Sequence, residues 1–201
     1  MSELLVFMEL GIRHILDLRA LDHVLFLLAL AAIYRVHDWR ESLWVVSSFT
    51  LGHSLTLALA VTGTLALPTA LIEFLIPVTI LATCVENILV ANRARAPWRG
   101  RYRPVLAGIF GLVHGAGFAN YLKSLFVERI AVPLLGFNIG IELGQIVVLA
   151  IAAAALAVLD TIIGAIRSPR MAPSPLRIRV LMVSSLVAVV ATRWAFERWL
   201  W

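Results

Sequence analysis

The sequence predicts an all-α, polytopic membrane protein in which six or seven helices form one bundle. Of its 201 residues, 61% are hydrophobic and 14% are charged, whereas an ordinary soluble domain is about half apolar and a quarter charged. A soluble domain of this length could not bury so much apolar surface. At about 20 apolar residues per span, the chain has room for six or seven spans. We therefore expect a single integral membrane domain over residues 1–201, without a separate soluble catalytic domain.

The N-terminal segment, residues 1–19, predicts an amphipathic helix rather than a clear span. Charged residues such as Glu3, Glu9 and Arg13 alternate there with apolar residues at near-helical spacing, which is the pattern of a helix with one apolar face. The segment lacks the basic start and small-residue cleavage site of a secretory signal. We expect it to lie at the membrane interface or to insert partly into the bundle.

Six apolar segments follow, and they are the expected spans. They cover residues 21–36, 42–62, 69–90, 104–122, 131–166 and 180–195. The fifth is long enough to contain one span with an extension or a break near Asp160. Glycines recur in the fourth and fifth segments, and Gly136, Gly140 and Gly144 lie at every fourth position. Such spacing lets helices approach closely in lipid, so we expect these two segments to pack together.

The basic residues indicate the orientation and partners of the chain. Sixteen of the 17 basic residues are arginines, and most lie in two loops, residues 92–103 and 167–179. Arginine-rich loops face the cytoplasm, which predicts a multi-pass protein of the bacterial inner membrane with its C-terminus outside. A basic soluble protein would suggest nucleic acid, but basic membrane loops explain the charge here. We expect contact with membrane lipids, no nucleic-acid partner, and leave a homo-oligomer open.

Several ionisable residues lie where lipid should exclude them. Each costs roughly 2.5–3.5 kcal/mol at the centre of a span, which makes it a functional hypothesis by default. His53, His114 and Glu142 lie ten or eleven residues into their segments, roughly 15–16 Å along a helix. They are therefore expected near the membrane middle. The predicted metal ligands, around an outward-facing vestibule, are His14, Asp22, His23, His53, His114 and Glu142, with Glu86, Asn138 and Gln145 as supporting residues.

The residue types indicate the metal. Imidazole and carboxylate without thiolate suit divalent transition ions such as nickel, cobalt or zinc. The single cysteine, Cys84, excludes an intrachain disulfide and a multi-cysteine cluster. A transport site needs a few ligands with incomplete coordination, whereas a catalytic zinc site needs three ligands and an open position for water. The same residues would serve either purpose.

Six short motifs give the chain a resemblance to a known family. They are GIRHIL at 11–16, LDHVLFLL at 21–28, FTLGHSLTL at 49–57, VEN at 85–87, FGLVHGAGFA at 110–119 and FNIGIELGQ at 137–145. Over about residues 10–150 the sequence resembles the HupE/UreJ family of bacterial membrane proteins. The resemblance implies six or seven spans and a link to nickel or cobalt uptake for hydrogenase and urease. It would carry the family's polar motif residues onto His14, Asp22, His23, His53, Glu86, His114 and Glu142.

Three functions stay open on the sequence alone. The first is a divalent-metal permease, and the second is an intramembrane metal-dependent hydrolase or acyl transferase using Ser54, Glu86 or Glu142 as catalytic residues. The third is a non-catalytic metal-binding accessory subunit. A permease needs a polar route to the cytoplasm, whereas a hydrolase can have a sealed floor. The inner half shows few polar residues in the sequence, chiefly Glu86 and Asn87, which favours a sealed floor.

Overall fold

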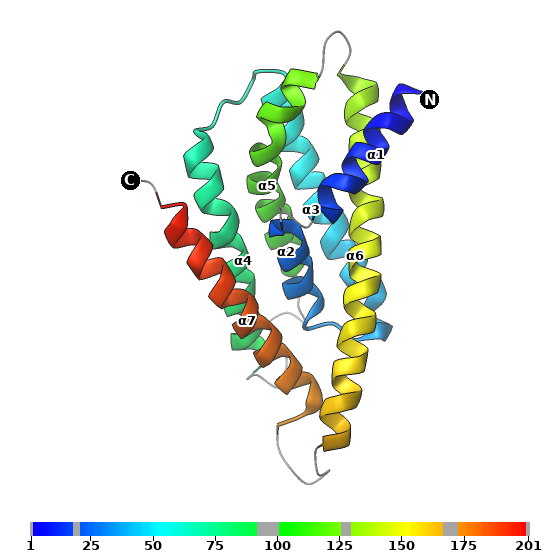
Figure 1. Ribbon diagram of the computed structural model, residues 1–201, viewed down its shortest axis with the longest axis vertical. Helices are drawn as coiled ribbons and strands as arrows, with labels where there is room; N and C mark the ends of the chain where they lie inside the picture. Colours follow the sequence, from blue (N-terminus) through cyan, green and yellow to red (C-terminus); the bar gives the residue numbers. More distant parts are fainter. Residues whose placement is uncertain (1, 18–20, 92–100, 126–129, 167–172, 200–201) are drawn as a thin grey trace.

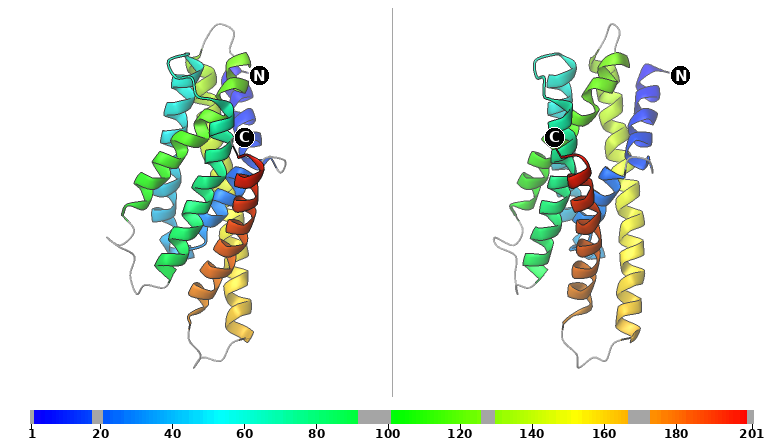
Figure 2. Two further views of the ribbon diagram at one scale, coloured as in Figure 1. Left: turned by 90° about the vertical axis from the view of Figure 1, so that its left-hand side faces the viewer. Right: turned by 60° about the vertical axis from the view of Figure 1, so that its left-hand side comes forward.

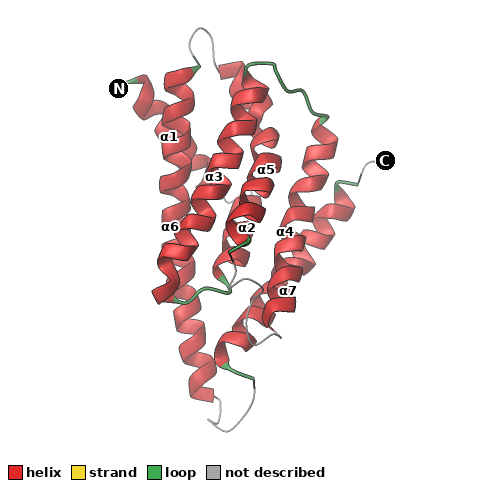
Figure 3. Ribbon diagram, turned by 180° about the vertical axis from the view of Figure 1, so that it is seen from behind, coloured by secondary structure: helices red, strands yellow, loops and turns green. Residues whose placement is uncertain are grey.

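The protein is a bundle of α-helices (Figures 1 and 3). The computed structural model describes residues 2–17, 21–91, 101–125, 130–166 and 173–199, with the backbone alone at 119–121 and 123–125. The helices are α1 (Glu3–Leu16), α2 (Asp22–Ala31), α3 (Trp39–Val61), α4 (Thr69–Ala91), α5 (Arg103–Leu125), α6 (Ala131–Ile166) and α7 (Pro175–Glu197), and a 3-10 turn covers Val36–Asp38. No strand occurs within the described ranges, and the predicted all-α fold class is confirmed.

Four of these helices are long and apolar enough to cross a membrane, counting only described residues: α3 with its preceding turn, α4, α6 and α7. Helix α6 has 36 residues, roughly 54 Å at 1.5 Å per residue, which exceeds the ~30 Å hydrocarbon core of a bilayer. It runs unbroken through Asp160, so the expected extension is present and a break there is not. The protein is a membrane protein.

Helix α7 begins before its predicted start. Ser174 caps it, with its side chain accepting a hydrogen bond from the Arg177 backbone at 3.4 Å, and Pro175 opens the first turn. Proline suits that position because its missing N–H would be unpaired there anyway. Arg177 and Arg179, expected in a loop, therefore lie in the first turns of α7. In the other arginine-rich stretch, residues 92–100 lie outside the described residues and Arg103 begins α5.

Three helix pairs surround the short helix α2 (Figures 1 and 2). The pairs are α3 with α5, α1 with α6, and α4 with α7, and α2 contacts members of all three. The expectation that the fourth and fifth segments, α5 and α6, pack together is wrong. Gly108, Gly111 and Gly115 of α5 face α3, and a Cβ on Gly111 would lie 2.9 Å from the His53 nitrogen. Gly136, Gly140 and Gly144 of α6 face α1 instead, and a Cβ on Gly140 would lie 3.0 Å from the Gly11 α-carbon.

Helices α1 and α2 follow one another down the bundle. Figure 2 shows α1 descending from the end where the N-terminus lies, and α2 continuing from mid-height toward the opposite end. The N-terminal helix lies along α6 with Gly11 and Ile15 buried. Glu9 and Arg13 form an exposed ion pair of 2.6 Å on its other face. The amphipathic segment is thus inserted in the bundle, and the helical path is interrupted between Leu16 and Asp22.

Candidate metal site

Four histidines from four helices meet at the interruption between α1 and α2. His14 lies in the last turn of α1, His23 in the first turn of α2, His53 within α3 and His114 within α5. One ring nitrogen each of His14, His23 and His53 lie within 4.8 Å of one another. The ring centroids of His23 and His114 are 5.3 Å apart. This group, His14, His23, His53 and His114, is called the histidine site below.

Close helix contacts hold these histidines in place. On α5, Gly115 faces the His53 backbone so closely that an added Cβ would lie 2.9 Å from the His53 α-carbon. Because Gly115 directly follows His114 in the sequence, this contact fixes the position of His53 along the bundle relative to His114. On α6, a Cβ at Gly144 would lie 2.9 Å from the Ile15 Cβ, next to His14 in sequence. Glycine is required at these contacts because any side chain would push the helices apart.

Most ring nitrogens of the site have no hydrogen-bond partner among the described residues. They are His14 Nε2, His23 Nε2, His53 Nδ1, His53 Nε2 and His114 Nδ1, and all are buried. The His53 side chain is 0% exposed and that of His114 is 1% exposed. An unpaired buried polar group costs about 1–3 kcal/mol, and neutral imidazole nitrogens are common ligands of divalent transition ions. A bound ion would convert several unpaired groups into bonds.

The hydrogen bonds of Thr79 set the tautomer of His114. The Thr79 hydroxyl donates to the Ile76 carbonyl at 2.7 Å and lies 3.0 Å from His114 Nε2. A hydroxyl has one proton, so Thr79 accepts from Nε2–H of His114. The Nδ1 lone pair of His114 is then available to a ligand. Such an outer partner orients a metal-binding histidine and fixes its tautomer.

Aromatic side chains enclose the histidine site. The buried Phe26 and Phe49 rings lie 5.4 and 5.1 Å from the His114 ring, centroid to centroid. Phe118 and Phe137 stack with centroids 5.3 Å apart, and Phe118 lies 4.0 Å from the His14 ring. An apolar shell limits solvent access and strengthens electrostatic interactions with a bound ion.

The predicted carboxylate ligands have other partners. Glu142 accepts a hydrogen bond of 2.5 Å from Ser47, and Asp22 pairs with Arg198 at 3.4 Å. Glu86 pairs with Arg103 and accepts from Tyr102. Asp22 and Glu86 each pair with an arginine, whereas Glu142 accepts from a neutral hydroxyl. The structure brings together His14, His23 and His53, with His114 beside them, and leaves the donor set of this group entirely nitrogen.

The two supporting amides, Gln145 and Asn138, both lie on α6. Gln145 is fully buried and accepts a hydrogen bond of 2.7 Å from Thr50, joining α6 to α3. Asn138 has a buried Oδ1 with no hydrogen-bond partner in the described part of the chain. Gln145 thus links two helices, and a role as ligand for either amide is a prediction that stays open.

A line of polar side chains on α4, which sequence reasoning missed in part, leads from His114 toward the arginine-rich end. Thr79, Thr83 and Asn87 are spaced four residues apart and all are buried, so they share one helix face. A cavity of about 160 Å³ lies beside Thr83, and its lining also includes Glu86 and Arg103. The four-residue spacing was the available signal, but threonine is a weak signal because it can bond its own helix backbone.

Comparison with protein families gives a further result. The sequence profile described as HupE / UreJ protein matches residues 1–198. The chain belongs to the HupE/UreJ family. Membership implies an accessory membrane protein concerned with nickel or cobalt. No curated protein and no solved structure matches the chain. In this HupE/UreJ protein, the motif segments 11–16, 21–28, 49–57 and 110–119 each supply one histidine of the site.

Proposed function

We propose that this HupE/UreJ protein binds a nickel- or cobalt-type divalent ion at the histidine site and passes it across the membrane. The observation that carries the proposal is the group of buried ring nitrogens without hydrogen-bond partners, three of whose residues converge within 4.8 Å. His14, His23 and His53 supply the first ligands, and His114 adds its Nδ1. An all-imidazole set suits such ions.

The polar line on α4 supports transport over a sealed site. An ion leaving the histidines would pass Thr79 and Thr83 and reach Glu86 beside the 160 Å³ cavity. Arg103 pairs with Glu86 there and repels a cation, so the pair closes the route. Release of Glu86 from Arg103 would supply a carboxylate to receive the ion. Asp22, beside His23 and paired with Arg198, is the proposed receiving residue at the other end.

A second candidate function is metal-dependent hydrolysis within the membrane. Three histidine donors with an open position are also the ligand set of catalytic zinc sites. Such a reaction needs a general base near the metal-bound water. The proposed bases Glu86 and Glu142 are bonded to Arg103 and Ser47, which favours transport. The third candidate function is that of an accessory subunit that binds the metal ion without transporting it.

Uptake into vesicles tests the proposal. The purified protein is reconstituted in liposomes that contain a metal-sensitive dye, and nickel is added outside. The wild type should load the vesicles, and His53→Ala should not. His37→Ala is the matched control, because His37 is exposed and lies outside the histidine site, paired with Asp38 at 3.2 Å. Metal binding without loading would refute transport, and metal-dependent ester hydrolysis in the same vesicles would favour the second candidate.

A further inference from the structure

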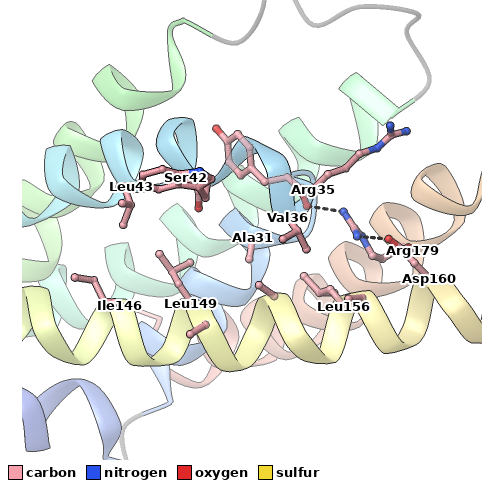
Figure 4. A pocket seen from close by; sticks show the side chains of 15 residues that line it. Ala31, Arg35, Val36, Ser42, Leu43, Ile146, Leu149, Leu156, Asp160 and Arg179 are labelled. Carbon is pink, nitrogen blue, oxygen red and sulfur yellow. Dashed lines mark hydrogen bonds and ion pairs between the residues drawn. The ribbon is translucent and has the colours of Figure 1, made fainter.

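A second cavity lies between helices α3, α6 and α7, away from the histidine site. Its volume is about 430 Å³, within the range of sites that hold small organic ligands. Figure 4 shows it along α6, with side chains of α3 and of the α2–α3 connection above. Its lining residues are Ala31, Tyr34, Arg35, Val36, Trp39, Ser42, Leu43, Ile146, Leu149, Ala150, Ala153, Leu156, Ala157, Asp160 and Arg179. This cavity is called the α6 groove below.

The body of the α6 groove is long and apolar. Along α6 the lining runs from Ile146 to Asp160, which is roughly 21 Å at 1.5 Å per residue. Ala150, Ala153 and Ala157 contribute single methyl groups to the lining, and larger apolar residues such as Leu43 complete it. A groove of this length and lining matches an extended hydrocarbon chain, and it lies within a span that contacts lipid.

Arginines lie at the Asp160 end of the groove. Arg179 donates to Asp160 at 2.5 Å and to the carbonyls of Ala32 and Tyr34 at 3.1 and 2.7 Å. These bonds use three of the five N–H donors of the Arg179 guanidinium. Asp160 balances the charge of Arg179, so the charge that favours an anionic group at this end comes from Arg35. Arg35 is exposed, and its side chain extends toward the same end of the groove (Figure 4).

A tryptophan marks the depth of this end in the bilayer. Trp39 is 55% exposed at the start of α3, and tryptophan is typical of the headgroup zone. Basic residues between helices at this depth bind anionic headgroups. The positive charge at this end and the apolar lining of the groove therefore match an amphiphilic ligand with an anionic headgroup.

We propose that the α6 groove binds an anionic phospholipid, with one acyl chain along Ala150, Ala153 and Ala157 and the phosphate beside Arg35 and Arg179. The lipid would join α3, α6 and α7 at the arginine-rich end. The site is separate from the histidine site, so the proposal does not depend on metal transport.

Native mass spectrometry of delipidated protein in detergent tests the proposal with two probes, phosphatidylglycerol and phosphatidylcholine. The wild type should bind phosphatidylglycerol more strongly by about fivefold for each arginine engaged. Arg35→Gln should reduce that preference about fivefold, and Ala153→Phe, which fills the groove, should remove the bound lipid of both kinds. Arg101→Gln and Ala154→Phe are matched controls, because both residues are exposed and outside the groove lining. Both should behave as the wild type.

Equal binding of the two lipids by the wild type would overturn the proposal, as would unchanged binding by folded Ala153→Phe. Folding is checked by the melting temperature, which all four variants should retain. Conversion of a wild-type dimer to a monomer by Ala153→Phe, without loss of lipid, would assign the groove to a second copy of the chain and would also overturn the proposal.

Discussion

Substitution of Gly115 by alanine tests whether the α3–α5 contact positions the histidine site. The new Cβ would lie 2.9 Å from the α-carbon and carbonyl carbon of His53, whereas carbon atoms pack at about 3.5–4.0 Å. The obstacle is backbone, so the two helices must separate by roughly 0.6 Å or more. Such overpacking costs about 1–3 kcal/mol. Alanine regains up to about 1 kcal/mol through its higher helix propensity, so the net effect is destabilising.

The same shift should weaken metal binding. Metal–ligand distances tolerate about 0.2 Å, so moving His53 by three times that distance removes or distorts one ligand bond. Loss of ligand orientation costs about 10–100-fold in affinity. Nickel titration and thermal unfolding of the purified protein in detergent measure both effects. Gly164→Ala is the control, because nothing lies within 4 Å of its added Cβ, and it should be neutral or stabilising. If Gly115→Ala matches Gly164→Ala in both measurements, the close contact does not position the site.

Three further predictions follow from the polar contacts. Asn87→Leu should destabilise the protein by about 2–4 kcal/mol in thermal or denaturant unfolding, because buried Asn87 donates to the Ala29 carbonyl and to Ser184 and accepts from Arg103; an unchanged melting temperature would contradict this. Glu86→Gln should slow nickel loading of vesicles at least tenfold while leaving nickel affinity within twofold, because Glu86 lies on the proposed exit and not among the histidines; a loss of affinity would place it in the binding site. Nickel should be released when the purified protein is strongly acidified, because protons compete for the imidazole nitrogens, and nickel that stays bound in strong acid would contradict histidine ligands.

The sequence predicts the fold class and the chemistry of the site because both depend on residue type. A high apolar content requires a membrane helix bundle, and buried histidines within spans indicate a ligand. Glycine spacing identified the surfaces that pack closely, such as that of Gly140. It could not identify the partner helix, because a small residue accepts any complementary backbone. The complementary residues, Gly11 on α1 and Gly52 on α3, stand alone in their helices and give no periodic signal.

The sequence likewise could not identify the partners of the carboxylates in the predicted ligand set. Glu142 and Asp22 are costly in lipid wherever they lie, and the sequence alone does not show what offsets that cost. Here Arg198 balances the charge of Asp22, and Ser47 donates a hydrogen bond to Glu142. Both partners come from segments that are far apart in the chain. Arg103 and Arg179 can be buried because each pairs with an acidic residue, and a paired arginine is tolerated inside the bundle.

The central claim is that the histidine site binds one divalent ion per chain, and nickel stoichiometry of the detergent-purified protein tests it most directly. The protein is equilibrated with nickel, separated from free ion, and analysed for metal. The wild type and His37→Ala should hold close to one nickel per chain, and the combined variant His23→Ala with His53→Ala should hold essentially none. Equal nickel in the combined variant, or none in the wild type, would contradict the account.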